Sequence, residues 1–355
     1  MIISGGGTGG HLYPALAIAD EFKSRHKTAD ILFVGALGRI EMMKVPKAGY
    51  RIIGLWIDGI QRSLSFRNFM FPVKLILSLF KSIAILLKFK PDVVVGTGGF
   101  ASGPLLFMAS VFKIPTLIQE QNSYPGITNK LLSKTVKTIA VGYHGLERFF
   151  PKDKLIHTGN PIRKSIVDGK LNPTEAKTFF NQIEGMSTLV VLGGSLGARC
   201  INQLIASQLE IFEQNGVQLI WQCGTLYYDQ YKKHQSDQVK VVPFVAEMDQ
   251  LYAASDMIIS RSGAATLSEI CCAARPALLI PSPNVAENHQ YHNAKALADK
   301  GAALLITEKD LDQNFEVVFT QLLDSRIQQE MVDNLKKLAQ PEATFKIVNL
   351  VEALL

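Results

Sequence analysis

The feature that most constrains the fold is a pair of glycine-rich segments about half a chain apart. The first, residues 4–11 (SGGGTGGH), comes directly after Ile2 and Ile3, and the second, residues 192–199 (LGGSLGAR), follows the apolar run 188–192. Each reads as a strand, a glycine turn and the start of a helix, where glycine lets the backbone approach a ligand and the helix N-terminus offers N–H groups to an anion. The pair predicts two nucleotide-binding-type domains that face each other across a cleft and hold a phosphate-bearing ligand.

Short β-rich runs alternate with helical patterns in both halves of the chain, which predicts an α/β fold with parallel sheets and helices on both faces. The expected strands lie at residues 31–34, 93–95, 116–118, 188–192, 219–222, 239–242, 257–259 and 277–280. Ligands of such sheets bind beyond the carboxyl ends of the strands, which is where the glycine segments fall.

The alternation breaks at residues 159–163, and the polar stretch 170–173 follows. We therefore expect a first domain at residues 1–163 and a second domain at residues 164–342. The closing helix, residues 343–355, is expected to pack back on the first domain. A chain of 355 residues is long enough for two domains of ordinary size.

The positive charge is concentrated in one segment. The chain has a net charge of +6, and it carries no acidic residue between Asp58 and Asp92. The basic residues of that interval are Arg62, Arg67, Lys74, Lys81, Lys88 and Lys90. Because this charge accompanies an aliphatic segment rather than a groove, we expect no nucleic-acid partner.

The cysteines give no sign of a disulfide framework or a zinc site. The chain has Cys200, Cys223, Cys271 and Cys272, and no two of them have CxxC spacing. This usage favours a protein of the reducing cytosol. The N-terminus shows neither a basic start nor a cleavage site, so we expect no secretory signal.

Residues 69–89 are apolar and long enough to suggest a transmembrane helix, but Lys74, Lys81 and Lys88 interrupt them every seven residues. On a helix this spacing places the lysines on nearly one face. We interpret the segment as a basic amphipathic helix on an anionic membrane surface; the alternative is an ordinary docked helix with a solvated lysine edge. The expected membrane contacts are Phe69, Phe71, Lys74, Lys81 and Lys88.

Residues 5–10 match the dinucleotide fingerprint GxGxxG, which is a weak signal alone. A nicotinamide site needs an acid at the end of the next strand, but Gly35 and Ala36 stand there. A Walker loop is excluded because His11 stands where Lys and Ser or Thr are required. The segment is therefore predicted to cradle a phosphate or a sugar, with His11 at its rim as a general base, a polar contact or a helix-start residue.

Residues 193–197 (GGSLG) also match the nucleophile elbow of α/β-hydrolases. A downstream histidine is available at His234, His289 or His292. That reading leaves the first glycine segment and a third one, residues 96–99, without a role, so we do not favour it.

Two polar segments of the second half are candidate ligand contacts. Residues 261–269 (RSGAATLSE) follow an apolar strand, and Glu269 is suited either to accept both hydroxyls of a ribose or to favour a helix start. Residues 284–293 are suited either to read sugar hydroxyls or to form a solvated loop. Asp310 and Asp312 match a metal-binding DxD pattern but look like a helix cap, so we expect no metal site.

A series of motifs occurs in order along the chain: GGTGGH at 6–11, GTGGFASGP at 96–104, EQN at 120–122, GNPIR at 159–163, GGSLGA at 193–198, RSGAATLSE at 261–269 and HQYHNA at 289–294. Together they resemble the MurG family, the lipid II-forming peptidoglycan N-acetylglucosaminyltransferases, across essentially the whole chain.

The resemblance implies a GT-B architecture of two Rossmann-like domains and an inverting transfer of GlcNAc. The donor would be UDP-GlcNAc, and the acceptor the 4-hydroxyl of the muramic acid in lipid I, which gives lipid II. It further implies a peripheral protein at the cytoplasmic face of the inner membrane, without a cofactor or a tightly bound metal. Other proteins of cell-wall synthesis are expected partners.

The resemblance also implies roles for single residues. Thr8, Gly9 and Gly10 would line the donor side, with His11 at the acceptor as the catalytic base. Further donor contacts are expected from Asn122, Arg163, Ser195, Val245, Ala264, Ala265, Thr266, Leu267, Ser268, Glu269 and Gln290. Of these, Ser195 would hold the diphosphate, the Val245 backbone the uracil, Glu269 the ribose and Gln290 the sugar.

The chain departs from many relatives at Gln119 and at His289, so the roles of these two residues stay open. Two alternatives remain beside the transferase: a UDP-GlcNAc 2-epimerase, which shares the fold, and a non-catalytic subunit that binds a sugar nucleotide. The basic apolar segment and His11 favour a transferase. In the expected mechanism His11 takes the proton of the acceptor hydroxyl, which displaces UDP at the anomeric carbon.

Overall fold

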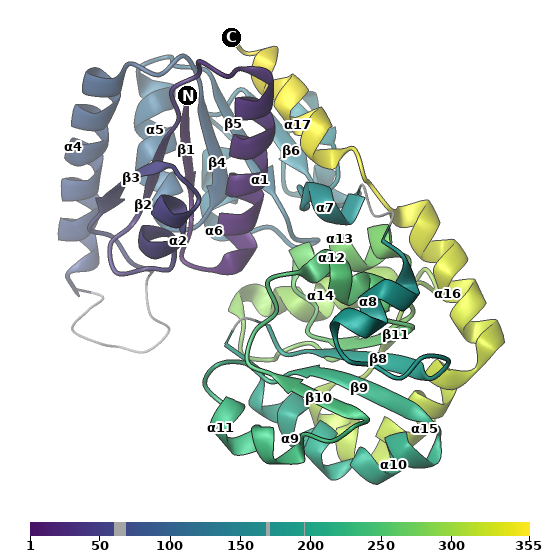
Figure 1. Cartoon of the computed structure of the whole chain (residues 1–355). Helices are drawn as coiled ribbons and strands as arrows, with labels where there is room; N and C mark the ends of the chain where they lie inside the picture. The colour runs from purple at the N-terminus through teal and green to yellow at the C-terminus, as the bar shows by residue number, and fades with distance from the viewer. Residues whose placement is uncertain (60–68, 168–170, 195) are drawn as a thin grey trace. The chain divides into compact units, whose positions relative to one another are not determined.

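The computed structural model describes residues 1–59, 69–167, 171–194 and 196–355. These residues form two compact units (Figure 1). Unit 1 comprises Met1–Ile162 and Pro341–Leu355, and unit 2 comprises Arg163–Gln340. The chain therefore returns to unit 1 at its C-terminus.

The described part of unit 1 contains one sheet of seven parallel strands in the order β3-β2-β1-β4-β5-β6-β7. Its strands are β1 (Ile2–Gly5), β2 (Leu32–Ala36), β3 (Arg51–Leu55), β4 (Val94–Gly98), β5 (Thr116–Glu120), β6 (Thr138–Val141) and β7 (Leu155–His157). The order reverses direction beside β1 and β4, so the loops after these two strands lie at a topological switch point.

Helices cover both faces of this sheet, with α1 and α17 on one side and α4 and α5 on the other (Figure 1). Along β1, Ile2 packs with α4 and α5, whereas the next residue, Ile3, packs with α1 and α17. Both faces are buried, which explains why the strands read as continuous apolar runs. The helices are α1 (Gly9–Arg25), α2 (Glu41–Lys47), α4 (Phe71–Phe89), α5 (Ser102–Val111), α6 (Ile127–Leu132) and α17 (Ala343–Glu352).

The described part of unit 2 contains a second parallel sheet, of six strands in the order β10-β9-β8-β11-β12-β13. Its strands are β8 (Ser187–Leu192), β9 (Val217–Gln222), β10 (Val239–Val242), β11 (Met257–Ser260), β12 (Ala277–Leu279) and β13 (Leu304–Leu305). The switch point lies between β8 and β11, and each of these strands leads into one of the predicted ligand segments.

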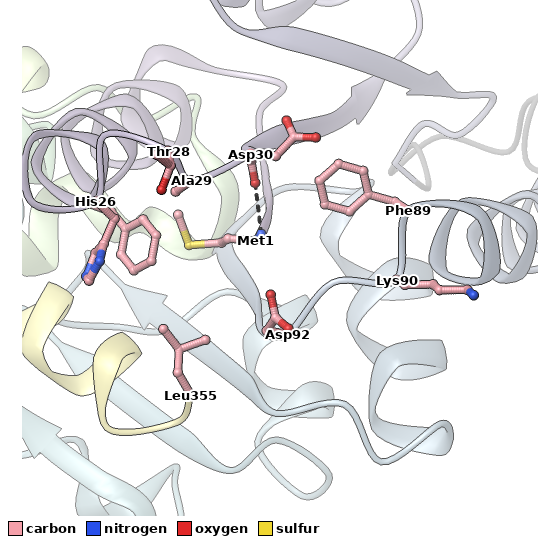
Figure 2. A pocket seen from close by; sticks show the side chains of 10 residues that line it. Met1, His26, Thr28, Ala29, Asp30, Phe89, Lys90, Asp92 and Leu355 are labelled. Atoms are coloured by element: carbon pink, nitrogen blue, oxygen red, sulfur yellow. Dashed lines mark hydrogen bonds between the residues drawn. The ribbon is translucent and has the colours of Figure 1, made fainter.

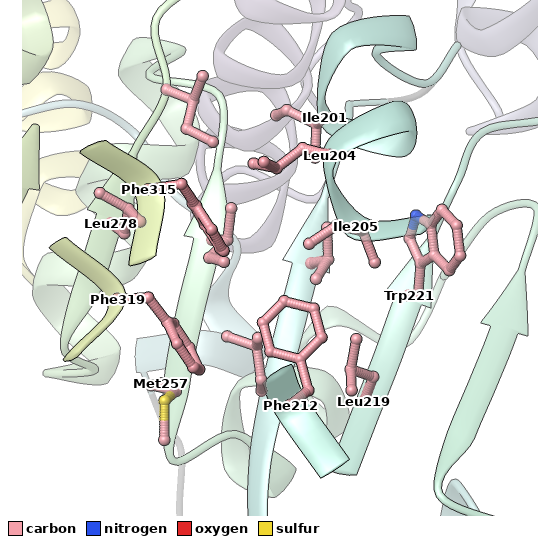
Figure 3. Close-up of a cluster of buried hydrophobic side chains, with 14 of the residues drawn as sticks. Ile201, Leu204, Ile205, Phe212, Leu219, Trp221, Met257, Leu278, Phe315 and Phe319 are labelled. Carbon is pink, nitrogen blue, oxygen red and sulfur yellow. The ribbon is translucent and has the colours of Figure 1, made fainter. Parts of the chain in front are cut away.

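One face of the unit 2 sheet packs against an aromatic core (Figure 3). The ring of Phe212 lies edge-on to those of Phe315 and Phe319, and Trp221 donates from Nε1 to Asn202 Oδ1 at 2.9 Å. The helices of unit 2 are α7 (Lys164–Val167), α8 (Pro173–Phe179), α9 (Arg199–Ser207), α10 (Leu209–Gln214), α11 (Tyr228–Tyr231), α12 (Met248–Ala254), α13 (Ala264–Ala273), α14 (His289–Ala298), α15 (Leu311–Leu323) and α16 (Ser325–Leu338).

The two sheets confirm the predicted α/β class with parallel strands. The sequence patterns missed β3, β6, β7 and β13, which are short or lie towards a sheet edge. Among the helices of the described residues, none is long and apolar enough to cross a membrane.

Candidate functional site

The first glycine segment forms the turn from β1 into α1. Thr8 takes the N-cap position of α1 with extended backbone angles, and Gly9 and Gly10 form the first turn. No acidic side chain lies in that first turn, so the N-terminus of the helix keeps its partial positive charge.

The carboxylate of Glu41 lies beneath this turn. It is fully buried and accepts hydrogen bonds from the backbone N–H of Gly7 at 2.8 Å and of Ala36 at 2.9 Å. A Cβ on Gly6 would lie 2.2 Å from Glu41 Cδ, and one on Gly35 2.5 Å from its Cγ. Glycine at these two positions therefore makes room for the carboxylate, a role the sequence patterns did not reveal.

The loop after β4 closes against the first turn. Gly98 has φ +101° and Gly99 φ +91°, a backbone region that L-residues with side chains rarely adopt. A Cβ on Gly99 would lie 2.3 Å from the carbonyl oxygen of Gly6, and one on Gly98 2.7 Å from His11 Nδ1. The third glycine segment thus allows two loops and an imidazole to pack in direct contact.

His11 contacts the loop after β5. Its Nδ1 lies 3.0 Å from Oε1 of Gln121, and its backbone carbonyl accepts from Thr97 Oγ1 at 2.7 Å. The contact joins residues that are 110 positions apart in the chain. The sequence analysis quoted Gln121 within a motif but gave it no role.

Behind His11 lies a buried network of amide side chains. Gln119 donates from Nε2 to Asn160 Oδ1 at 2.9 Å, and Asn160 donates from Nδ2 to the backbone carbonyl of Gln121 at 2.9 Å. All three side chains are at most 3 % exposed. The open question about Gln119 therefore has a structural answer: it packs within the network that holds Gln121.

Asn122 is positioned by its neighbour Glu120. One carboxylate oxygen of Glu120 accepts from the backbone N–H and the side-chain amide of Asn122, at 3.0 and 3.1 Å. The other accepts from Asn129 Nδ2 at 2.8 Å and from the N–H of Gly126 at 3.1 Å. Glu120 thus ties the loop after β5 to α6 and holds Asn122 at the carboxyl end of the sheet.

In unit 2, the second glycine segment forms the turn from β8 towards α9. Gly197 has φ +84°, and a Cβ there would lie 2.1 Å from the carbonyl oxygen of Cys223. Gln222 donates from Nε2 to the carbonyl of Gly194 at 2.8 Å, which ties the turn to the end of β9. The predicted diphosphate contact, Ser195, lies outside the described residues.

The start of α13 meets the loop that carries Gln290. Ser262 donates from Oγ to the backbone carbonyl of Gln290 at 2.9 Å, and Gln290 Oε1 accepts from the N–H of Ser282 at 2.9 Å. The helix begins after Gly263 and contains a continuous run of predicted donor contacts, namely Ala264, Ala265, Thr266, Leu267, Ser268 and Glu269. The side-chain carbonyl of Gln290 is therefore used internally, which directs its amide N–H groups to other partners.

Glu269 belongs to a buried polar cluster. Its Oε2 accepts from the hydroxyl of Tyr252 at 3.0 Å, and its Oε1 lies 3.9 Å from Nε of Arg163. Burial raises the pKa of Glu269, an effect that Arg163 and the Tyr252 hydrogen bond oppose. Burial and the nearby carboxylate hold the pKa of Tyr252 well above its ordinary value, so the phenol remains a donor. Arg163 and Glu269, which the resemblance named separately, thus lie together.

Two further residues of unit 2, Val245 and Asp310, were considered in the sequence analysis. Val245 is buried in the loop after β10. Asp310 takes the N-cap position of α15, but its side chain bonds to the Thr307 hydroxyl and not to the helix amides. No group of three His, Cys, Asp or Glu side chains in the described part of the chain could hold a metal ion.

The lysines of α4 differ from expectation. Lys74 donates to the Asp58 carboxylate at 2.7 Å, and Lys81 donates to the carbonyl of Gly54 at 2.7 Å. Two of the three lysines are therefore bound to the end of β3 and to Asp58 shortly after it, because residues 54–58 run beside the helix. Alongside the exposed Lys81 and Lys88, the helix exposes large apolar side chains; Val73, Ile76, Leu77, Phe80 and Leu87 form what we call the α4 stripe. Phe69 is 82 % exposed just before the helix, and Phe71 is half-buried.

A separate pocket lies at the opposite edge of the unit 1 sheet (Figure 2). Met1, Asp30 and Asp92 line it at the amino ends of the strands, and the Met1 ammonium donates to the carbonyl of Asp30 at 3.0 Å. No predicted site residue lines this pocket. Apart from Arg163, the described residues named for ligand binding follow the carboxyl ends of strands in the two sheets.

The chain matches two family models. The glycosyltransferase family 28 N-terminal domain matches residues 1–141, and the C-terminal domain of the same family matches residues 188–350. The first match ends with β6 and so leaves out β7, and the second begins inside β8; each model covers the glycine loops and most of the strands of one unit.

Curated relatives and a solved structure resemble the whole chain. Two relatives, from Christiangramia forsetii and Flavobacterium psychrophilum, are each 54 % identical to it. Both are named UDP-N-acetylglucosamine–N-acetylmuramyl-(pentapeptide) pyrophosphoryl-undecaprenol N-acetylglucosamine transferase. The first alignment covers 100 % of this chain and 97 % of the relative, and the second covers 98 % of this chain and 96 % of the relative. The crystal structure of Acinetobacter baumannii MurG superimposes with a TM-score of 0.80 at 26 % identity, covering 99 % of both chains. The chain therefore belongs to glycosyltransferase family 28 and, within it, to the MurG family.

Proposed function

We propose that this enzyme transfers GlcNAc from UDP-GlcNAc to the 4-hydroxyl of the muramic acid in undecaprenyl-pyrophosphoryl-MurNAc-pentapeptide, lipid I, and so forms lipid II. The observation that carries the proposal is the 54 % identity, over the full chain, to relatives named for this reaction. Those names favour a transferase over the epimerase and over the non-catalytic subunit.

Unit 2 is proposed to bind the donor. The N-terminus of α13 and the glycine turn after β8 offer backbone N–H groups to the diphosphate of UDP, as helix N-termini do for phosphates. Glu269 is proposed to accept the ribose hydroxyls, and the amide N–H groups of Gln290 to donate to the sugar. Ser195, Val245, Asn122 and Arg163 keep the donor contacts that the family resemblance assigns to them.

The reaction is proposed to be a direct displacement with inversion. The acceptor oxygen forms a bond to the anomeric carbon while the bond to the UDP oxygen breaks, and His11 takes the hydroxyl proton. A positioned base of this kind contributes about 10²–10⁴ to the rate. The backbone N–H groups around UDP stabilise the charge on the leaving group, and Thr8, Gly9 and Gly10 line the sugar in this proposal.

The transferase proposal is tested with radiolabelled UDP-GlcNAc and a lipid I analogue, with a control that contains no acceptor. We expect a labelled disaccharide-lipid product and UDP release that depends on the acceptor. UDP release without acceptor would point to a hydrolase, conversion of the donor to its C2 epimer to an epimerase, and donor binding without turnover to a carrier subunit.

The catalytic role of His11 predicts a loss of turnover without a loss of donor binding. We expect His11→Ala to lower kcat about 10²- to 10⁴-fold, because the base is removed, and to leave the affinity for UDP unchanged. The matched control is His26→Ala, since His26 lies at the end of the same helix and bonds to Glu352 instead. Steady-state kinetics and UDP titration measure both effects, and near-normal turnover in His11→Ala would reject the assignment.

We further propose that the α4 stripe docks on the cytoplasmic leaflet that holds the acceptor lipid. Apolar side chains on one exposed helix face, with basic side chains beside them, are suited to an anionic interface. In this proposal Phe69 and Phe71 insert with the stripe, the exposed Lys88 meets lipid headgroups, and Lys74 and Lys81 anchor the helix to unit 1. The protein then acts as a peripheral protein of the inner membrane, where other cell-wall synthesis proteins are its expected partners.

A further inference from the structure

The side-chain amide of Gln121 has a defined orientation. Its Nε2 lies 2.8 Å from the backbone carbonyl of Thr97 and 3.1 Å from that of Gln119. Backbone carbonyl oxygens accept hydrogen bonds and cannot donate them. The group that faces them must therefore be the NH₂ end of Gln121, and the carbonyl end, Oε1, is the end that faces His11.

The orientation is reinforced by the network behind it. Asn160 donates to the backbone carbonyl of Gln121, so its Oδ1 is the atom that accepts from Gln119 Nε2. The Oε1 of Gln119 then accepts from Gln121 Nε2. Every amide in this chain of hydrogen bonds is thus oriented by a backbone carbonyl, and the chain ends at Oε1 of Gln121.

The tautomer of His11 follows from this arrangement. Gln121 Oε1 can only accept, so the proton of the 3.0 Å contact belongs to Nδ1 of His11. A neutral imidazole carries one proton, which leaves Nε2 with a lone pair. Within the described residues the imidazole has no second hydrogen-bonding partner, and Gly98 packs against its Nδ1–Cε1 edge.

We infer that Gln121 is a positioning residue, which holds the His11 imidazole in the Nδ1–H tautomer so that Nε2 is the atom that takes a proton from the acceptor. The inference deepens the proposed function and rests on the role of His11 as base. A neutral amide performs this task without adding a charge beside the ring. It also leaves Nδ1–H hydrogen-bonded when Nε2 becomes protonated.

The carboxylates of the neighbouring loops have other partners. Glu41 accepts from the N–H groups of Gly7 and Ala36, and Glu120 accepts from Asn122, Gly126 and Asn129. The hydrogen bond of the imidazole within the described residues is therefore with an amide and not with an acid. This distinguishes the pair from a histidine–carboxylate arrangement.

The tautomer is measured without any substrate. In protein labelled with ¹⁵N-histidine, two-bond ¹H–¹⁵N correlations distinguish a protonated from an unprotonated ring nitrogen. The chain has seven histidines, and His11→Asn identifies the His11 signals by their disappearance. We expect Nδ1 of neutral His11 to be protonated. A protonated Nε2 in the wild-type protein would overturn the inference, whatever the activity.

The contribution to turnover is measured with Gln121→Leu, which keeps the approximate volume and removes the acceptor. We expect kcat to fall about 10- to 100-fold, with the KM for UDP-GlcNAc unchanged and with the tautomer preference of His11 lost. Gln119→Leu is the matched control, because it disturbs the same buried network without touching His11. In this control we expect both the tautomer preference of His11 and kcat to stay closer to the wild-type values.

Two further outcomes separate this inference from the proposed function. Loss of the tautomer preference with full turnover in Gln121→Leu would overturn the positioning role and leave the transferase standing. A kcat loss of equal size in Gln119→Leu, with the tautomer retained in both variants, would show general damage to the network and would also overturn it. The wild-type spectrum decides the tautomer even where a variant fails to fold.

Discussion

Buried polar side chains support the predicted ligand contacts in both units. The Glu41 carboxylate accepts a hydrogen bond from the turn before α1, and the Tyr252 hydroxyl donates to Glu269 within α13. Such groups are costly to bury unless each has a partner, so their environment controls both stability and ionisation. At Glu269, the contribution of the buried side chain to stability and its ionisation can be separated by experiment.

The titration of Glu269 predicts how stability depends on pH. Burial raises its pKa above the ordinary value of 4.5. The folded state then binds the proton more tightly than the unfolded state does, so this contribution to stability is complete below pH 4.5 and is lost as the pH rises through the folded pKa. Each unit of difference in pKa corresponds to about 1.4 kcal/mol in the free energy of unfolding.

We therefore expect Glu269→Gln to remove this pH-dependent loss, so that the variant gains stability relative to the wild type between pH 4.5 and pH 7. Urea unfolding at several pH values measures the difference, with the exposed Glu210→Gln as control. A difference that does not change with pH would contradict the prediction. The same variant is expected to bind UDP more weakly, because an amide has one acceptor oxygen instead of two.

At the scale of the element, two glycines of unit 1 offer a matched comparison. Gly99 and Gly7 have similar backbone angles, φ +91° and +85°, but a Cβ on Gly7 would have no atom within 4 Å. We expect Gly7→Ala to cost about 1–2 kcal/mol for the left-handed conformation alone. Gly99→Ala adds a collision with the carbonyl of Gly6, so we expect a loss of more than about 3 kcal/mol.

Chemical denaturation measures both free energies of unfolding. Equal losses in the two variants would show that the close approach of the loops after β1 and β4 does not contribute. UDP titration adds a second measurement, because a displaced loop after β4 also moves Gly98, against which His11 packs.

The α4 stripe makes a prediction about membrane binding. Phe80 is 66 % exposed, and we expect Phe80→Ser to lower partitioning into vesicles of anionic lipid about tenfold or more, since burial of a Phe side chain contributes about 1.5–3 kcal/mol. The matched control is Phe179→Ser, because Phe179 is 55 % exposed on α8 of unit 2. Vesicle sedimentation measures the partitioning, and equal effects of the two variants would reject the stripe as the docking surface.

At the scale of the whole molecule, α17 makes unit 1 depend on the last residues of the chain. Ile347, Val348 and Val351 are fully buried in the core that α1 shares, and Arg25 of α1 bonds to Asn349 at 2.6 Å. Burial of each aliphatic side chain contributes about 1.5–3 kcal/mol. The stability of unit 1 therefore depends on a segment that follows unit 2 in the sequence.

We expect deletion of residues 341–355 to lower the stability of unit 1 by more than about 4 kcal/mol, while unit 2 keeps its unfolding midpoint. The chain has two tryptophans, Trp56 in unit 1 and Trp221 in unit 2, so Trp221→Phe and Trp56→Phe each leave one reporter. Denaturation followed by fluorescence compares the two units. An unchanged Trp56 transition would show that α17 is dispensable.

Local patterns were sufficient to predict the parallel α/β class and the glycine turns. Strand runs, glycine clusters and helix starts are properties of neighbouring residues, so 2–11 and 188–199 can be read without knowledge of the rest of the chain. The family resemblance named individual residues such as His11 and Glu269, whose roles remain predictions. Short strands such as β7 and β13 were not predicted, because a few residues at a sheet edge carry little periodic signal.

Only the tertiary structure decided which distant residues meet. Gln121 reaches His11 across 110 positions, and Glu41 reaches Gly7 across 34, because the parallel sheet brings the loops after β1, β2, β4 and β5 to one edge. The lysine spacing in α4 was visible in the sequence, but the fold directed Lys74 to Asp58 and left the apolar stripe exposed. The sequence by itself thus determined the elements and the chemistry available at their ends. The strand order determined which of those groups became partners, since such contacts depend on crossovers that no local pattern records.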